Sequence, residues 1–121
     1  MNVELKTLLG SIGSNQSEIK VLLKTKSKTI KKVQSAMDEK ARTKTPLNEG
    51  QQRIVNELTG LYAKEGGQLQ ESLMRMEHVQ DDLHSGKAVM LSLLLLQRHQ
   101  SRAITCLRRI IASCERTLKN L

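Results

Sequence analysis

The sequence is nearly devoid of aromatic side chains: it has no Phe and no Trp, and Tyr62 is the only Tyr among 121 residues. Because β-strands draw heavily on aromatic and β-branched residues, this shortage argues against a β-rich fold. It also argues against nucleic-acid-binding modules that stack bases on aromatic rings. We therefore expect an all-α protein whose core is built from Leu, Ile, Val, Met and Ala.

Cysteines and long apolar runs are also scarce. Cys106 and Cys114 lie in a segment expected to be one helix, which places their Cα atoms about 12 Å apart, beyond the roughly 7 Å limit for a disulfide. We expect two free thiols and a reducing compartment. The most apolar stretch, Ala88–Leu96, is far shorter than the roughly 20 residues of a membrane-spanning helix, and the N-terminus lacks the apolar core of a secretory signal. The sequence therefore predicts a soluble protein of the cytosol or nucleus, without a membrane partner.

Charge is unevenly distributed along the chain. The formal net charge is +8 and the pI is near 9.8. Residues 1–44 carry a net charge of +6, residues 45–97 a net charge of −3, and residues 98–121 a net charge of +5. This order allows two interpretations: the basic segments attract the acidic one within the fold, or two basic faces are left for partners.

Apolar residues at helical spacing predict a bundle of about four helices, in a single domain covering residues 1–121. Residues 1–44 are expected to hold the basic N-terminal helices, with Gly10 and Gly13 weakening the end of a short first helix and Ser17 capping the second. The side of the second helix roughly opposite its apolar stripe carries four lysines, which we interpret as a solvated face: Lys20, Lys24, Lys28 and Lys31.

Residues 45–121 are expected to form the helical core. Pro46 interrupts the helical pattern, because the residue before a proline is pushed out of the helical region, and Asn48 is a plausible N-cap for the third helix. The Gly66-Gly67 pair is either a short break or a weak point in that helix. Ser85-Gly86 ends it.

The last helix, expected over about residues 87–120, is long and amphipathic. Its first part, Val89–Leu96, is apolar nearly all the way round and is expected at the centre of the core. Farther along, apolar residues repeat at spacings of three and four. On the far side, within roughly 40° of one another, lie four arginines: Arg98, Arg102, Arg109 and Arg116.

The arginine stripe has three possible functions. Arginines along one helix face can contact successive phosphates of DNA or RNA with little sequence preference. The stripe can also be a protein–protein surface or a solvated face, since no aromatic residues and no helix-turn-helix pattern accompany it. These alternatives remain open from the sequence.

No catalytic, cofactor-binding or metal-binding pattern stands out. His99, Cys106 and Cys114 are separated by steps of seven and eight residues, about 10–12 Å along a helix, whereas zinc ligands all lie within about 2.3 Å of the metal. No Ser or Cys is recognisably placed beside a base. We expect no enzymatic activity, no cofactor and no metal. One acidic patch is interpreted as a solvated face or a docking site for the basic helices: Glu71, Glu77, Asp81 and Asp82.

Two stretches carry a resemblance to a known family. The chain reads PLNEGQQRIVNELTGLY from Pro46 and LQRHQSRAITCLRRI from Leu96. This resembles the helical domain of a GINS replication complex subunit of the Psf-one type, over about half the chain. The matching positions are Pro46, Asn48, Glu49, Leu61, Tyr62, Gln97, Arg98, Leu107 and Arg109.

The resemblance implies a non-enzymatic structural subunit. Such a subunit packs against other GINS-type helical subunits in a hetero-oligomer, which joins the replicative helicase ring in the nucleus during initiation and elongation of DNA replication. DNA contact through the basic faces is a further expectation. The alternatives to this interpretation are a small basic helical nucleic-acid-binding protein and a helical adaptor unrelated to replication. The residues expected at the partner interface are Tyr62, Arg98, Arg102, Arg109 and Arg116.

Overall fold

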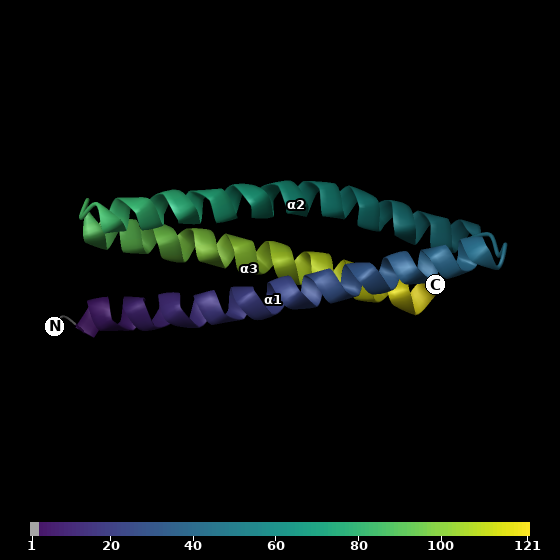
Figure 1. The fold of residues 1–121 in the computed structure, drawn as a ribbon, viewed down its shortest axis with the longest axis horizontal. Coiled ribbons are helices and arrows are strands. Elements are labelled where there is room, and N and C mark those ends of the chain that lie inside the picture. The colour runs from purple at the N-terminus through teal and green to yellow at the C-terminus, as the bar shows by residue number, and fades with distance from the viewer. Residues whose placement is uncertain (1–2) are drawn as a thin grey trace.

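The computed structural model describes residues 3–121, which form three long helices. In Figure 1, α1 (Val3–Arg42) and α3 (Val89–Asn120) run in the same direction, and α2 (Glu49–His84) runs in the opposite one. The predicted all-α class is confirmed, because this part of the chain contains no strand. The expected number of about four helices is wrong: the described residues form three.

The error lies in the N-terminal third. A first helix was expected to end near Gly10 and Gly13 and a second to begin at Ser17, but α1 passes through all three positions without interruption. Helical glycines cost about 1 kcal/mol each relative to Ala. Packing offsets this cost, because Leu8, Ile12 and Ile19 are buried on the same stripe against α3. The expected solvated lysines of this helix are all exposed: Lys20, Lys24, Lys28 and Lys31.

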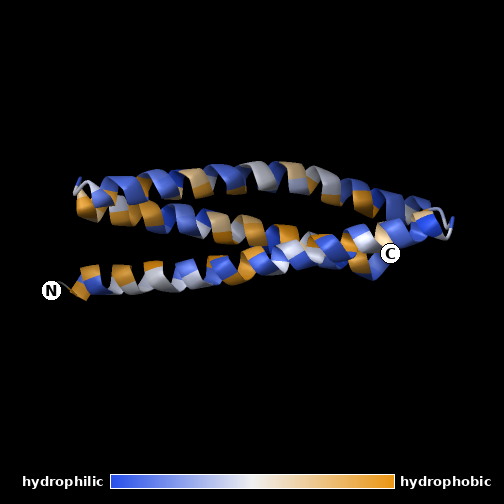
Figure 2. Ribbon diagram, viewed as in Figure 1, coloured by the Kyte–Doolittle hydropathy of each residue, from blue (hydrophilic) through white to orange (hydrophobic). Residues whose placement is uncertain are grey.

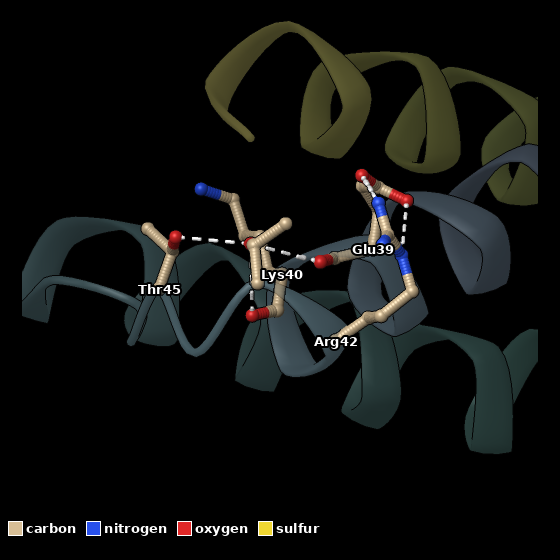
Figure 3. Close-up of polar contacts among 5 residues, drawn as sticks. Glu39, Lys40, Arg42 and Thr45 are labelled. Carbon is tan, nitrogen blue, oxygen red and sulfur yellow. Dashed lines mark hydrogen bonds and ion pairs between the residues drawn. The ribbon is translucent and has the colours of Figure 1, made fainter.

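Local polar contacts end α1, as Figure 3 shows. The Thr43 hydroxyl donates to the Glu39 carbonyl across 2.9 Å and lies 3.0 Å from the Thr45 hydroxyl. The Thr45 backbone N–H also donates to the Lys40 carbonyl across 2.9 Å. Arg42 forms an exposed ion pair with the Glu39 carboxylate. The two hydrogen bonds to the Glu39 and Lys40 carbonyls satisfy acceptors that the end of a helix leaves without intrahelical partners. The chain then turns through Pro46, as the sequence predicts.

The predicted cap at Asn48 is confirmed. Its side-chain oxygen accepts a hydrogen bond from the Gln51 backbone N–H at 2.8 Å, and the Gln51 side-chain oxygen accepts from the Asn48 backbone N–H at 3.1 Å. This reciprocal arrangement is a capping box. The Gln51 amide nitrogen also donates to the Asn120 carbonyl at 2.9 Å, which ties the start of α2 to the end of α3.

The glycine pair Gly66-Gly67 does not break α2, which runs unbroken to its predicted end at Ser85-Gly86. Glu65 and Leu69 flank the pair and are both buried. The pair is therefore a weak point within one long helix, and tertiary contacts on both sides hold it.

Helix α3 is the central element, because it packs against both α1 and α2, whereas no Cα atom of α1 lies within 8 Å of one of α2. Its Ala103, Leu107 and Ile110 are completely buried. Gln100 is also completely buried: its side chain donates to the Ile12 carbonyl of α1 and accepts from the Asn15 amide, both across 3.2 Å. This clamp fixes the register of α1 on α3. None of the helices over residues 3–121 is long and apolar enough to cross a membrane.

Candidate functional site

Four arginines line an open groove of about 590 Å³ between α2 and α3. Arg75 comes from α2, and Arg98, Arg102 and Arg109 come from α3, with Arg102 one turn after Arg98 and Arg109 two turns after Arg102. We call this the arginine groove. Three of the five interface residues expected from the sequence are therefore brought together, and Arg75 joins them from the acidic middle of the chain.

The four arginines differ in how they are paired. Arg75 forms an ion pair with Glu71 one turn earlier, with an N–O distance of 2.9 Å. Arg109 donates to the buried Glu65 across 3.1 Å. Among residues 3–121, no carboxylate pairs with Arg98 or Arg102. The middle of the groove therefore keeps an excess of positive charge.

This excess positive charge affects the pKa of the neighbouring His99. The residue is only 8% exposed, and its Nδ1 atom is buried without a hydrogen-bond partner. Burial lowers the pKa of His99, and the nearby Arg75, Arg102 and Arg98 lower it further. Because both effects disfavour imidazolium, His99 is neutral at pH 7.

Beside the Arg109 end of the groove, the buried Glu65 pairs with Arg109 through one oxygen and has the other, Oε2, without a hydrogen-bond partner. A hydrogen bond from the Cys106 thiol and the charge of Arg109 lower the pKa of Glu65, against the opposing effect of burial. Burial and the Glu65 carboxylate raise the pKa of Cys106 to about 11. Cys106 is therefore a protonated thiol at neutral pH, and the thiolate is the nucleophilic form.

The other two expected interface residues lie elsewhere. Arg116 is near the end of α3, where it pairs with Glu57 of α2 at 3.3 Å. Tyr62 is 41% exposed on a different side of α2, facing α1, and the Lys26 ammonium lies 5.6 Å from its ring centroid. The five residues therefore do not form one site. Arg109 and Arg116 instead join the basic end of the chain to its acidic middle.

The start of α3 corrects another expectation. Val89–Leu96 was expected at the centre of the core, but within it only Ser92, Leu93 and Leu96 are buried. Five apolar side chains on the other sides are 36–58% exposed and form what we call the α3 apolar patch: Val89, Met90, Leu91, Leu94 and Leu95.

The physical reason is the number of neighbouring helices. A helix that is apolar on every side needs neighbours on every side to bury it. At this end α3 has two, α1 and α2, so one side of the helix stays uncovered. In Figure 2, apolar residues gather at the left-hand ends of α1 and α3, and exposed Val3 and Leu9 of α1 belong to this end. The Ser11–Gln97 hydrogen bond, 2.9 Å long, holds the two helices side by side there.

Both cysteines are free, as expected from their spacing, and both are buried. Within residues 3–121, no three His, Cys, Asp or Glu side chains are grouped so that they could hold a metal ion. No protein-family model matches the chain, and neither the curated proteins nor the solved structures contain a match.

Proposed function

We propose that the protein is a non-enzymatic structural subunit of a multi-protein assembly, and that it binds a partner through the α3 apolar patch. The observation that carries this proposal is the exposure of five large apolar side chains on consecutive turns of one helix. Contiguous apolar patches are uncommon on monomers and mark protein interaction sites. Covering the exposed halves of Leu91 and Leu94 would contribute about 2 kcal/mol, at roughly 1.5–3 kcal/mol for a fully buried Leu.

The chemistry of the arginine groove fits a structural role better than a catalytic one. The buried carboxylate beside it, Glu65, is paired with Arg109, so its charge serves to join α2 to α3. His99 is neutral and packed between the helices. Glu65 is therefore occupied in joining the two helices.

The assembly we propose is the GINS complex, on the strength of the sequence resemblance. The partners would be other GINS-type helical subunits and the replicative helicase ring, and the site of action would be the nucleus. Two features support this choice: Asn48 and Gln51 cap the helix in which the resemblance begins, and Tyr62 of the same motif is half exposed.

Affinity purification from cells tests this proposal. We compare the tagged chain with Leu91→Glu/Leu94→Glu, which places two carboxylates in the patch. The matched control, Ala63→Glu/Ala112→Glu, adds the same charge at two exposed alanines outside it. We expect GINS subunits to co-purify with the unmodified chain and the control, and their recovery to fall at least tenfold with the patch variant. Equal recovery with both variants would contradict docking through the patch, and partners of another kind would contradict the GINS assignment.

A second candidate function is binding of nucleic acid in the arginine groove, favoured by the unpaired Arg98 and Arg102 beside Arg75. Fluorescence anisotropy with a labelled DNA or RNA duplex tests it. Arg98→Glu/Arg102→Glu should abolish binding and flatten its salt dependence, whereas Arg53→Glu/Lys119→Glu, at exposed positions outside the groove, should weaken it far less. Absence of binding by the unmodified chain at low salt eliminates this candidate.

A further inference from the structure

A second groove, between α1 and α2, is left open by the way the helices pack. Both helices contact α3, but their backbones stay more than 8 Å apart at the Cα atoms. Three hollows follow this seam: one beside Gly13 and Met76, one beside Leu23 and Tyr62, and one beside Val33 and Leu58. The second and third share Ile30, Gln34 and Tyr62, and the first lies farther toward the start of α1. We call the three hollows together the α1–α2 groove.

The floor of the α1–α2 groove is apolar. Ile19, Val33 and Leu58 line it and are buried, and Cys114 of α3 closes its base. Above this floor, Tyr62 reaches toward α1 and lies under the Lys26 ammonium. A cation over an aromatic face contributes about 0.5–1 kcal/mol at exposed sites, so this contact is a weak link across the seam.

The rim of the groove carries charge of one sign only. Three lysines of α1 line it, Lys20, Lys26 and Lys31, and no Asp or Glu does. The lining residues from α2 are uncharged. Along α1, residues 20–32 contain six lysines and no carboxylate. None of these six lysines forms an ion pair within residues 3–121.

We propose that the α1–α2 groove binds one amphipathic helix of an acidic partner protein, which completes a four-helix bundle. An apolar floor suits the apolar face of a helix laid along the groove, as in other helix-in-groove complexes. The lysine rim then faces carboxylates on the flanks of that helix. The three hollows are spread along about 21 residues of α1, or roughly 32 Å, so a partner helix of about 20 residues would lie over all of them.

The same charges distinguish between possible occupants. A second copy of this chain is disfavoured because the chain carries a net charge of +8 and would bring further lysines to the rim. Nucleic acid would pair with the lysines but would leave the half-buried apolar lining residues Leu23 and Ile30 uncovered. An acidic amphipathic helix satisfies both. This site is separate from the α3 apolar patch, so the inference stands or falls independently of the proposed function.

Titration with a designed peptide tests the inference, using the full chain. The probe is a synthetic 21-residue amphipathic helix with Leu on one face, Glu on both flanks, and no Tyr or Trp. Its counterpart has Lys in place of every Glu. Tyr62 is the only aromatic residue and lies in the groove, so its fluorescence reports binding directly. We expect saturable binding of the acidic peptide and none of the basic one. Absence of binding by the acidic peptide overturns the proposal.

Two variants with equal changes in charge separate the groove from general attraction. Lys26→Glu/Lys31→Glu alters the rim, and Lys28→Glu/Lys32→Glu alters exposed lysines of the same helix outside it. We expect the rim pair to weaken binding at least tenfold and the control pair less than threefold. If the rim pair unfolds the chain, Lys26→Gln/Lys31→Gln and its control Lys28→Gln/Lys32→Gln provide the same comparison. Equal weakening by both pairs overturns the proposal.

Competition identifies the occupant. A single-stranded DNA oligonucleotide is added to the peptide complex, and the oligomeric state of the free chain is measured across a concentration series. We expect no displacement of the peptide at physiological salt and a monomeric free chain. Displacement that is lost in Lys26→Glu/Lys31→Glu would assign the groove to nucleic acid. Self-association lost in that variant would assign it to a second copy.

Discussion

Arg109 and Glu65 form an ion pair whose two members differ greatly in burial: the side chain of Glu65 is 5% exposed and that of Arg109 is 59% exposed. Removing one member of the pair therefore has a different consequence from removing the other. Without Arg109, a carboxylate stays buried without its cation. Without the charge of Glu65, the guanidinium is left in water, where an unpaired cation costs little.

The first prediction follows from this asymmetry. Arg109→Met should lower the free energy of unfolding by about 1–3 kcal/mol, less than for a fully buried pair because Arg109 is more than half exposed. Glu65→Gln should cost about 1 kcal/mol or less. The double variant should be more stable than Arg109→Met alone. Urea unfolding at pH 7 measures the free energy of unfolding of the unmodified chain, the two single variants and the double variant. A larger loss of this free energy in Glu65→Gln than in Arg109→Met would contradict the prediction.

The same pair predicts an acid dependence of stability. The pKa of Glu65 is lowered in the folded chain by Cys106 and Arg109, so its contribution is complete above the unfolded value of about 4.3 and is lost as the pH falls through the folded value. The free energy of unfolding of Glu65→Gln should therefore decrease less with falling pH than that of the unmodified chain. Identical acid-unfolding curves for the two proteins would contradict this.

His99 should lower the free energy of unfolding in mild acid. Its pKa is lowered by burial and by Arg75, Arg102 and Arg98, an effect that Glu71 partly opposes. The unfolded chain therefore takes up a proton near pH 6.5 that the folded chain resists, and stability should fall between pH 7.5 and 5.5.

Urea unfolding across this pH range, in the unmodified chain and in two variants, measures the effect of His99. His99→Leu should flatten the pH dependence. His78→Gln, at an exposed histidine of α2, should leave it in place. The same slope in His99→Leu and in the unmodified chain would assign the pH dependence to other groups.

The helical glycine pair offers a stabilising change. An added Cβ at Gly67 meets nothing within 4 Å, and one at Gly66 meets only Tyr62 at 4.0 Å, an ordinary contact. Because Ala is favoured over Gly in helices by about 0.5–1 kcal/mol, Gly66→Ala/Gly67→Ala should gain about 1–2 kcal/mol and raise the melting temperature. Gly86→Ala should instead destabilise, since Gly86 has a φ of +72°. A loss of stability in the Gly66-Gly67 variant would mean that the pair serves a close approach or a bend.

The capping box at the start of α2 predicts a local cost. Asn48→Ala removes the acceptor for the Gln51 N–H and should cost about 1 kcal/mol. Asn56→Ala, an exposed position in the interior of the same helix, should change stability by about 0.5 kcal/mol or less. Thermal unfolding of the two variants makes the comparison, and equal melting temperatures would contradict the role of the cap.

Local signals in the sequence were sufficient where local chemistry decides the structure. Pro46, Asn48 and Ser85-Gly86 mark the connections correctly, because a turn or a cap depends on residues within one helical turn. Gly10, Gly13 and Ser17 misled because their weak local preference is outweighed by the burial of a long stripe of α1 against α3. The packing of α1 against α3 therefore explains why the N-terminal third forms one helix and not two.

The site depended on distant relationships in the same way. The arginine stripe was visible in the sequence, but Arg75 was not associated with it, because the register of α2 on α3 is set by side-chain packing. Val89–Leu96 was expected in the core because it is apolar on nearly every side, but the composition of a segment does not indicate how many helices surround it. Gln100, polar and fully buried, had no local signal that distinguished it from an exposed glutamine.

Binding of a neutral apolar dye such as Nile red to the purified chain tests the central claim most directly. A neutral dye is needed because a protein with a net charge of +8 attracts anionic dyes regardless of apolar surface. We expect a strong rise in dye emission with the folded chain, lost in Leu91→Glu/Leu94→Glu and kept in Ala63→Glu/Ala112→Glu, with all three proteins cooperatively folded. A folded, monomeric chain that leaves the emission of the dye unchanged would contradict it.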